Sequence, residues 1–312
     1  MTCRKCHASI PNPDNQHLVI HTLVRTAVMK RLFLAITLLA LTASAVKAED
    51  FGLWSEVGIQ QNLGVRGLSA ELGYDIRLNN HVKGVTRRSF NVGLNYSLTR
   101  NLKVGATYAY IYSFSKGECE DKYNTDDDGN IDYSQWKGYN YTQSFWRNKH
   151  RFIGYLKGDI DLGRFNISLR ERYQHTVFQS TKTTKEKYRY NTIYDEDDNV
   201  SYELKGGYPE LEEDGKRSKV RDYLRQKVEL TYNIRHCPIN PDVSVEMENN
   251  LHNSFHIDEM RYVAGAVWKV TKQIHLGLHY RFHKGEGDDD DSNMHAIEFS
   301  LKFKNPFWRA KK

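Results

Sequence analysis

The sequence predicts an all-β protein: an antiparallel transmembrane β-barrel of about ten to twelve strands with long extracellular loops. Three observations lead to this fold class. A secretory signal stands near the N-terminus, apolar and polar residues alternate in runs of about ten to thirteen residues, and the links between the runs are short and long in turn. Together they describe an exported chain whose strands are long enough to cross a bilayer.

Residues 29–48 have the three parts of a secretory signal peptide. Met29 begins a short basic segment, residues 32–45 are apolar but too few to span a bilayer, and small residues lead up to Ala48, after which we expect cleavage. Residues 1–28 lack this character, so we interpret them as an upstream extension from a misplaced start. Their CRKCH motif spells a haem-attachment pattern, but it lies upstream of the cleavage site, and we expect no haem.

The predicted barrel occupies residues 49–305, and residues 306–312 form a C-terminal tail. One side of each run is apolar and the other polar, which is the two-residue period of a strand. The ten clearest runs are 68–78, 89–98, 102–114, 149–161, 165–177, 221–234, 242–252, 260–270, 274–283 and 294–303. An eleventh run at 54–63 conflicts with the even count that is usual when both termini lie in the periplasm, so the prediction stays at ten to twelve strands.

The links between the runs indicate orientation and location. Short links alternate with longer polar ones, as periplasmic turns alternate with extracellular loops in barrels of the Gram-negative outer membrane. The short links are 99–101, 162–164, 236–241 and 271–273, and the longer ones are 115–148, 178–220 and 284–293. The sequence therefore predicts an outer-membrane location, with the short links facing the periplasm.

Aromatic residues lie near both ends of the runs, as the two interfaces of a bilayer favour. Tyr110 and Tyr112 precede a long link, and Tyr232 and Trp268 lie by short ones. A soluble exported β-protein would also show alternation, but these two aromatic girdles favour a membrane barrel. The formal charge of +6 is too small and too scattered to predict nucleic-acid binding.

Glu171 departs from the pattern, because strict alternation places it on the apolar face with Leu169 and Tyr173. A carboxylate facing lipid is unfavourable. We therefore expect a β-bulge that turns this side chain inward. The cysteines of the mature chain, Cys119 and Cys237, fall on opposite rims and are not expected to form a disulfide.

Four strand phrases carry a resemblance to a known family: LRERY at 169–173, LRQKVEL at 224–230, DEMRY at 258–262 and HAIEFSL at 295–301. Through them the chain resembles, from just after the signal to about Phe303, the uncharacterised bacterial outer-membrane family named domain of unknown function 2490. The resemblance implies a barrel and assigns no catalytic residue. A looser similarity, at the level of fold alone, is to the oligogalacturonate porins, small barrels with basic lumens that pass acidic sugars.

The polar faces of the predicted strands carry more basic than acidic residues. The basic residues expected in the lumen are Arg77, Lys103, Arg151, Lys157, Arg170, Arg172, Arg225, Lys227, Arg261, Lys269, Arg281 and Lys302. The acidic residues of the same faces are Glu56, Glu71, Asp75, Asp159, Glu229, Glu246, Glu248 and Glu298. A basic excess along a channel favours anions. The alternative is that these charges pair across neighbouring strands and fill a narrow interior.

Three functions remain open. The first is a narrow porin-like channel with anion bias, and the second is a non-conducting barrel that serves surface binding or envelope structure through its acidic outer loops. The third, an outer-membrane enzyme, needs a nucleophile and a base within hydrogen-bond reach. His279 and Glu298 are the nearest such pair, but no serine partner is identifiable, so no enzymatic activity is predicted. His275, His279 and His283 stand roughly 13 Å apart along one strand, too far to share a metal ion.

Residues 124–135 match part of a calcium-binding loop. Asn124, Asp126, Asp128 and Asp132 supply oxygen atoms at four ligand positions, whereas glutamine replaces the bidentate glutamate at the last position. Weak Ca²⁺ binding is thus one hypothesis, and a solvated acidic loop is the other.

Acidic clusters recur at 195–198, 212–214 and 288–291, and we expect these to be hydrated and mobile. They are also candidates for holding divalent cations beside lipopolysaccharide. The expected partners are outer-membrane lipid, lipopolysaccharide and the barrel-assembly machinery. The sequence leaves the oligomeric state open.

Overall fold

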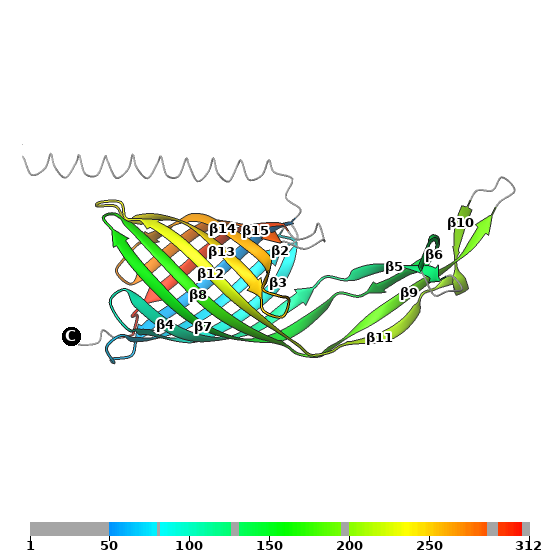
Figure 1. Cartoon of the computed structure of the whole chain (residues 1–312), viewed down its shortest axis with the longest axis horizontal. Coiled ribbons are helices and arrows are strands. Elements are labelled where there is room, and N and C mark those ends of the chain that lie inside the picture. Colours follow the sequence, from blue (N-terminus) through cyan, green and yellow to red (C-terminus); the bar gives the residue numbers. More distant parts are fainter. Residues whose placement is uncertain (1–49, 80–81, 126–130, 195–199, 286–292, 308–312) are drawn as a thin grey trace, which may run out of the picture. The chain divides into compact units, whose positions relative to one another are not determined.

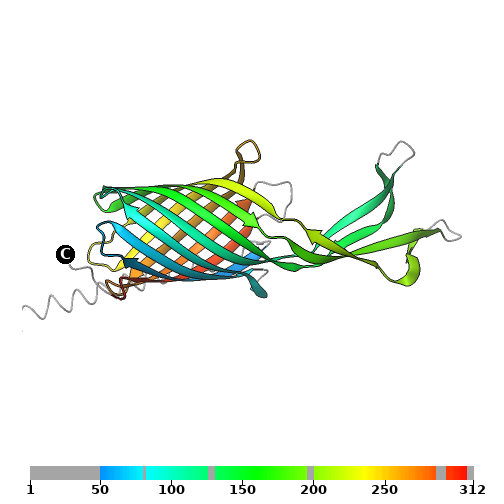
Figure 2. The ribbon, with the colours of Figure 1, turned by 90° about the horizontal axis from the view of Figure 1, so that it is seen from below.

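A computed structural model describes residues 50–79, 82–125, 131–194, 200–285 and 293–307. Eleven strands form one closed barrel (Figures 1 and 2). They are β1 (Asp50–Asn62), β2 (Leu68–Asn79), β3 (Gly84–Ser97), β4 (Leu102–Ser115), β7 (Phe145–Leu162), β8 (Phe165–Phe178), β12 (Lys219–Tyr232), β13 (Ile239–Asn250), β14 (His256–Lys269), β15 (Ile274–Gly285) and β16 (Met294–Lys304). The fold class is confirmed, with a strand count inside the predicted range. The residues predicted as a signal peptide and its upstream extension lie outside the described residues.

The barrel closes where the two ends of the chain meet. Strand order around the wall is β1-β16-β15-β14-β13-β12-β8-β7-β4-β3-β2, and β1 pairs with both β2 and β16. Every pairing is antiparallel except β1 with β16, which is parallel from Asp50↔Met294 to Gln60↔Lys304. The run at 54–63 is therefore a spanning strand. The parallel pairing removes the parity conflict, because β1 begins at one rim and β16 ends at the other.

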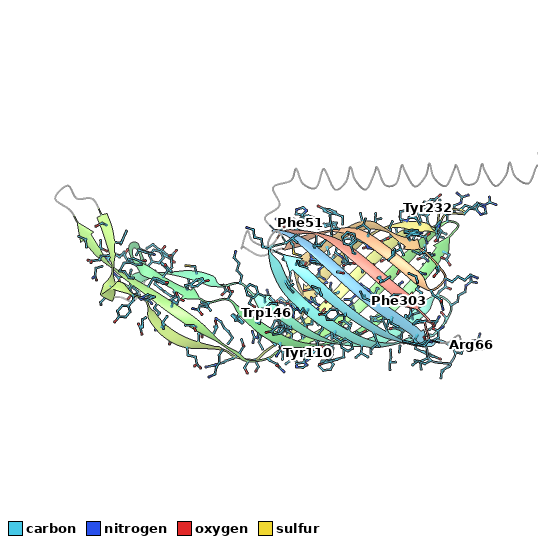
Figure 3. All side chains as sticks on the ribbon, turned by 180° about the vertical axis from the view of Figure 1, so that it is seen from behind. Phe51, Arg66, Tyr110, Trp146, Tyr232 and Phe303 are labelled. Carbon is cyan, nitrogen blue, oxygen red and sulfur yellow. The ribbon has the colours of Figure 1, made fainter. Side chains whose placement is uncertain are left out.

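The two rims differ. Short turns connect the strands at the rim where β16 ends, which we call the turn-side rim; the opposite rim, where β4, β7, β8 and β12 continue into a second sheet, is the loop-side rim. In Figure 3, Tyr110 and Trp146 lie toward the loop-side rim, and Arg66 and Tyr232 toward the turn-side rim.

Alternation divides each barrel strand between the wall's two faces. Leu72, Phe90 and Leu169 project outward and are 41%, 48% and 52% exposed, as are many other large apolar side chains of the wall. The inward faces carry most of the charged residues. A belt of exposed apolar side chains this continuous is unfavourable in water and favourable in hydrocarbon, and closure leaves no unpaired strand edge. The wall is that of a transmembrane β-barrel.

The prediction of a β-bulge at Glu171 is wrong. Its strand pairs without a register shift on both sides, with Leu156↔Glu171 on β7 and Gln226↔Glu171 on β12. The carboxylate therefore lies on the outward face between exposed Leu169 and Tyr173. Gln226, its outward cross-strand neighbour, gives it a polar companion, and the strand stays regular.

The two long links also differ from the prediction, since they are largely strands rather than solvated loops. A five-stranded extension sheet consists of β5 (Glu118–Thr125), β6 (Ile131–Thr142), β9 (Thr181–Tyr194), β10 (Val200–Leu204) and β11 (Glu210–Lys216). A 3₁₀ turn, η1 (Lys205–Gly207), joins the last two. The acidic cluster at 212–214 belongs to strand β11, and its Glu213 forms an exposed ion pair with Lys182 at 2.7 Å. The clusters at 195–198 and 288–291 lie outside the described residues.

Aromatic side chains hold the extension sheet together. Tyr139 stacks on Tyr188 with ring centroids 4.5 Å apart, and Trp136 stacks on Tyr190 at 5.1 Å. Gly138 lies between Trp136 and Tyr139 in the sequence of β6, and its φ is 129°. A Cβ atom there would stand 2.0 Å from the carbonyl oxygen of Tyr188, so only glycine fits this bulge.

None of the described residues forms a helix long and apolar enough to cross a membrane. Cys119, in β5, and Cys237, in a turn-side connection, are free cysteines.

Candidate functional site

The structure places all twelve basic residues that we proposed for the lumen on the inner face of the wall. Eleven of them line internal cavities: Arg77, Arg151, Lys157, Arg170, Arg172, Arg225, Lys227, Arg261, Lys269, Arg281 and Lys302. Lys103 lies on the inner face of β4, where its Nζ is 3.5 Å from Asp159. The two-residue period thus brings basic residues from eight different strands to one interior.

Three cavities occupy this interior. A loop-side cavity of about 230 Å³ is lined by seven arginines and one carboxylate, that of Glu248. The middle cavity, of about 460 Å³, also holds five carboxylates, and the turn-side cavity, of about 550 Å³, includes His275 and His279. Neighbouring cavities share wall residues, so they succeed one another through the barrel.

Six arginines line both the loop-side and the middle cavity. We call this set the arginine neck: Arg77, Arg87, Arg151, Arg225, Arg261 and Arg281. They come from β2, β3, β7, β12, β14 and β15, on all sides of the barrel. Guanidinium groups therefore surround the connection between the two cavities.

On one wall, carboxylates neutralise the neck. Arg225 and Arg261 both contact Glu246, and Arg261 also lies 2.8 Å from Glu248 and contacts Glu259. Arg170 joins the same cluster at 2.9 Å from Glu246. The neighbouring Arg281 pairs with Glu298 at 2.7 Å. These charge-assisted hydrogen bonds tie β8 and β12–β14 together and join β15 to β16, as the hypothesis of a charge-paired interior expects.

The facing wall is less neutralised. Arg77 and Arg87 share Asp75, at 3.6 and 3.8 Å. Arg151 donates a hydrogen bond to the Thr176 hydroxyl at 3.2 Å. Within the described parts of the chain, neither Arg151 nor Arg172 forms an ion pair with a carboxylate. A positive excess therefore remains on the wall formed by β2, β3, β7 and β8.

Trp54 orients two arginines of the neck. Its ring is 3% exposed and is fixed by a hydrogen bond from Nε1 to Asn79 Oδ1 at 3.0 Å. The guanidinium of Arg77 lies 3.9 Å from the ring centroid, and that of Arg281 lies 5.7 Å away. Stacking of this kind fixes the plane of a guanidinium and so aims its donors.

A second basic group, the collar, surrounds Phe178 where β8 reaches the loop-side rim. Arg147, Lys149, Lys219 and Arg221 all lie over the Phe178 ring, with 4.8 to 5.7 Å between charge and centroid. Arg147 also donates a hydrogen bond to the carbonyl oxygen of Gln179 at 2.6 Å. In the portion of the chain that is described, no carboxylate forms an ion pair with any of the four.

The three histidines of β15 are divided between two cavities. His279 lies across from Glu298 in the β15–β16 pairing, but its Nε2 is 3.2 Å from Asp242 while Glu298 binds Arg281. His283 lines the loop-side cavity, away from His275 in the turn-side cavity. Over the described ranges, no three His, Cys, Asp or Glu side chains gather as metal ligands.

For the calcium hypothesis, Asn124 and Asp132 are direct cross-strand partners of β5 and β6, and Asn124 donates a hydrogen bond to Gln135 at 3.2 Å. Asp126 and Asp128 lie outside the described residues.

Sequence reasoning missed Arg87 and the collar. Arg87 stands two residues before Ser89, where the predicted strand began, so extending the alternation of Ser89, Asn91 and Gly93 by one step would have placed it in the lumen. Lys149 and Arg221 share the inward parity of Arg151 and Arg225. Arg147 and Lys219 lie in segments that were assigned to long links, and no signal of the sequence reassigns them.

Comparison with known proteins identifies a family for the chain. The model of the family described as "Protein of unknown function (DUF2490)" matches residues 51–294. No curated protein matches the chain.

Among solved structures, the chain is similar to the translocator domain of the autotransporter NalP from Neisseria meningitidis, with 8% identity, 85% of this chain and 94% of that chain covered, and a TM-score of 0.47. It is also similar to the NanC porin, with 11% identity, 79% and 92% coverage and a TM-score of 0.38. For OmpF of Salmonella typhi in complex with daunomycin, the identity is 8%, the coverage 67% and 86%, and the TM-score 0.22.

Proposed function

The chain belongs to the family described as "Protein of unknown function (DUF2490)", and from that premise we propose that it is a porin-like channel of the Gram-negative outer membrane that favours anions. The predicted signal peptide and the apolar wall together support this location. Outer-membrane lipid, lipopolysaccharide and the barrel-assembly machinery are its proposed partners.

The arginine neck is the observation that carries this proposal. Because its six arginines line both the loop-side and the middle cavity, a solute that moves from one cavity to the other passes between guanidinium groups. Rings of Arg or Lys side chains select anions by lowering the electrostatic cost of entry.

Carboxylates reduce this preference without cancelling it. Glu246, Glu248 and Glu298 neutralise one wall, whereas Arg151 and Arg172 add charge that no described carboxylate pairs with. The collar adds four cations at the loop-side rim, where a focused positive potential raises the local concentration of anions. The expected result is anion preference rather than strict exclusion of cations.

Conductance of the purified full chain in planar bilayers under a salt gradient tests the proposal. The expected reversal potential has the sign of anion preference, and Arg87→Gln reduces it. Arg88→Gln is the matched control, since Arg88 is the next residue and projects outward from the same strand. Arg88→Gln removes the same charge outside the lumen, so we expect it to leave the reversal potential unchanged. Absence of channel events, or cation preference, would refute the proposal.

A second function, surface binding by a barrel that does not conduct, is favoured by the extension sheet. Trp136, Tyr139, Tyr188 and Tyr190 form a stacked row on its β6 and β9 strands. Tyrosine and tryptophan are enriched at recognition surfaces. This function replaces the first if the folded barrel gives no current in bilayers.

A further inference from the structure

The loop-side cavity has the features of a binding site rather than of a passage alone. It is small and strongly basic, and the arginine neck bounds it below. We propose that it binds a compact polyvalent oxyanion, with inorganic phosphate or a terminal phosphoryl group as the recognised chemistry. This inference deepens the proposed function and depends on it in one respect, namely that the cavity opens to the medium at the loop-side rim.

Hydrogen-bond donors remain free in this cavity. The Nε of Arg87 is buried and has no hydrogen-bond partner, and the nearest carboxylate contact of its guanidinium, to Asp75, is 3.8 Å, longer than a hydrogen bond. Arg151 donates one hydrogen bond to the neutral Thr176 hydroxyl. A buried hydrogen-bond donor without a partner is unfavourable in free energy. An oxyanion that accepts a hydrogen bond from this donor would remove that cost.

The directions of these donors favour a tetrahedral anion. Arg87 and Arg151 reach the cavity from β3 and β7. On the facing wall, Arg281 of β15 binds Glu298 through Nε and one terminal nitrogen, which leaves its other terminal nitrogen for a ligand. A carboxylate offers oxygen atoms in a single plane, whereas phosphate presents them in four directions and so can accept hydrogen bonds from both walls.

The site is organised before a ligand arrives. Trp54 holds Arg77 by stacking, and the buried ion pair with Glu298 fixes Arg281. Ligands gain affinity when the groups that bind them lose little freedom on binding. The ring of Phe178 similarly gathers the collar above the cavity, where its four cations attract anions toward the entrance.

Volume and charge restrict the ligand to this cavity. About 230 Å³ lies below the range of roughly 300 to 1,000 Å³ that is usual for drug-sized ligands, so the ligand is small. The middle cavity has the same excess of six basic over acidic side chains, eleven against five, in twice the volume, so its positive charge is less concentrated and is interrupted by carboxylates. A phosphate that enters from the loop side therefore binds above the neck.

Isothermal titration of the full chain in detergent tests the site, with inorganic phosphate as the probe and succinate, a dianion whose oxygen atoms lie in two planar carboxylate groups, as the comparison. We expect one phosphate per barrel and binding of succinate about tenfold weaker or more. Arg87→Gln and, separately, Arg151→Gln each weaken phosphate binding about tenfold, whereas the outward control Arg88→Gln leaves it unchanged. Heat-dependent gel mobility of each variant verifies that it is folded, and two sites are tested so that one misfolded variant does not decide the outcome.

Failure of the inference is distinguishable from failure of the proposed function. Anion-selective currents without phosphate binding, or with equal binding of succinate, overturn the inference and leave the channel standing. Phosphate binding without any current overturns the channel and leaves the site standing. If both hold, phosphate added on the loop side reduces the chloride current, and Arg87→Gln relieves this block.

Discussion

Arg172 of β8 and Arg225 of β12 are direct cross-strand partners on the inner face of the barrel. Among the residues that the structure describes, Arg225 pairs with Glu246 and, at 3.3 Å, with Glu248, whereas Arg172 pairs with no carboxylate. Like charges that face each other across two strands destabilise a sheet. The pairing therefore keeps a positive charge in the lumen at some cost in stability, which is the pattern of a functional residue rather than a structural one.

This pair predicts two different outcomes for the same substitution. Arg172→Gln removes a repulsion, so the free energy of unfolding stays within about 1 kcal/mol of the original or rises. Arg225→Gln leaves Glu246 and Glu248 with fewer counterions and lowers it by about 1.5–3 kcal/mol. Urea unfolding in detergent, followed by tryptophan fluorescence, measures both. Equal losses would contradict the assignment of Arg172 to function.

Asp75 is the carboxylate shared by Arg77 and Arg87, so its removal leaves the positive charge of both arginines without this counterion. Asp75→Asn keeps the size of the side chain and is expected to increase anion preference. The reversal potential in a salt gradient measures the change, and a shift toward cations would show that Asp75 does not act on the permeation path. Glu171→Gln, on the outward face, is the control that changes the same charge outside the lumen.

Gly73 faces the middle cavity from β2, and its nearest side chain, that of Asn91, lies 3.6 Å from where a Cβ would stand. A larger residue therefore fits and projects into the cavity. We expect Gly73→Leu to reduce single-channel conductance without changing the sign of selectivity, because no charge is altered. An unchanged conductance would mean that ions do not pass through the middle cavity.

Glu171 faces outward beside Gln226 among apolar side chains. Glu171→Leu is expected to raise the free energy of unfolding in lipid by less than about 2 kcal/mol, since Asp and Glu cost less than Arg or Lys on the lipid face. Refolding titrations in lipid vesicles measure the gain. A loss of stability would show that the carboxylate has a partner on this face.

Tyr188 donates a hydrogen bond to Glu186 at 2.7 Å in the extension sheet, and this bond raises the pKa of Tyr188 to about 12. Because the folded pKa lies above the usual value of 10.0, the bond stabilises the sheet fully below pH 10 and its contribution is lost between pH 10 and about 12. A tyrosinate absorbance titration of Tyr188→Phe against the original chain should lack one component near pH 12. Two superimposable curves would contradict this.

Much of the barrel could be predicted because the alternation of apolar and polar residues within each strand identifies its outward and inward faces. The period of two put Arg170, Arg172 and Arg225 in the lumen without knowledge of their neighbours. The arginine neck could not be predicted in the same way, since its members lie on six strands and share a height only through the stagger of the sheet. Arg87 and Arg281 are 194 residues apart along the chain, and no local pattern relates them.

Two elements were misjudged for physical reasons. The extension sheet was expected to be solvated loop because its residues are polar, yet Tyr139 and Tyr188 stack and Glu213 pairs with Lys182. β1 conflicted with an assumed even count, because the parity rule takes every pairing to be antiparallel. The pairing of distant strands in the extension sheet and the parallel pairing of β1 with β16 cannot be predicted from the residue pattern of one segment at a time.

The parallel seam between β1 and β16 has a consequence for where the polypeptide begins and ends. A chain that crosses the bilayer eleven times enters on one face and leaves on the other. Anything fused ahead of Asp50 and anything fused behind Lys304 would therefore occupy different compartments, joined only by the barrel between them. Assembly must accordingly leave the leading end of the first strand and the trailing end of the last strand on opposite faces of the membrane.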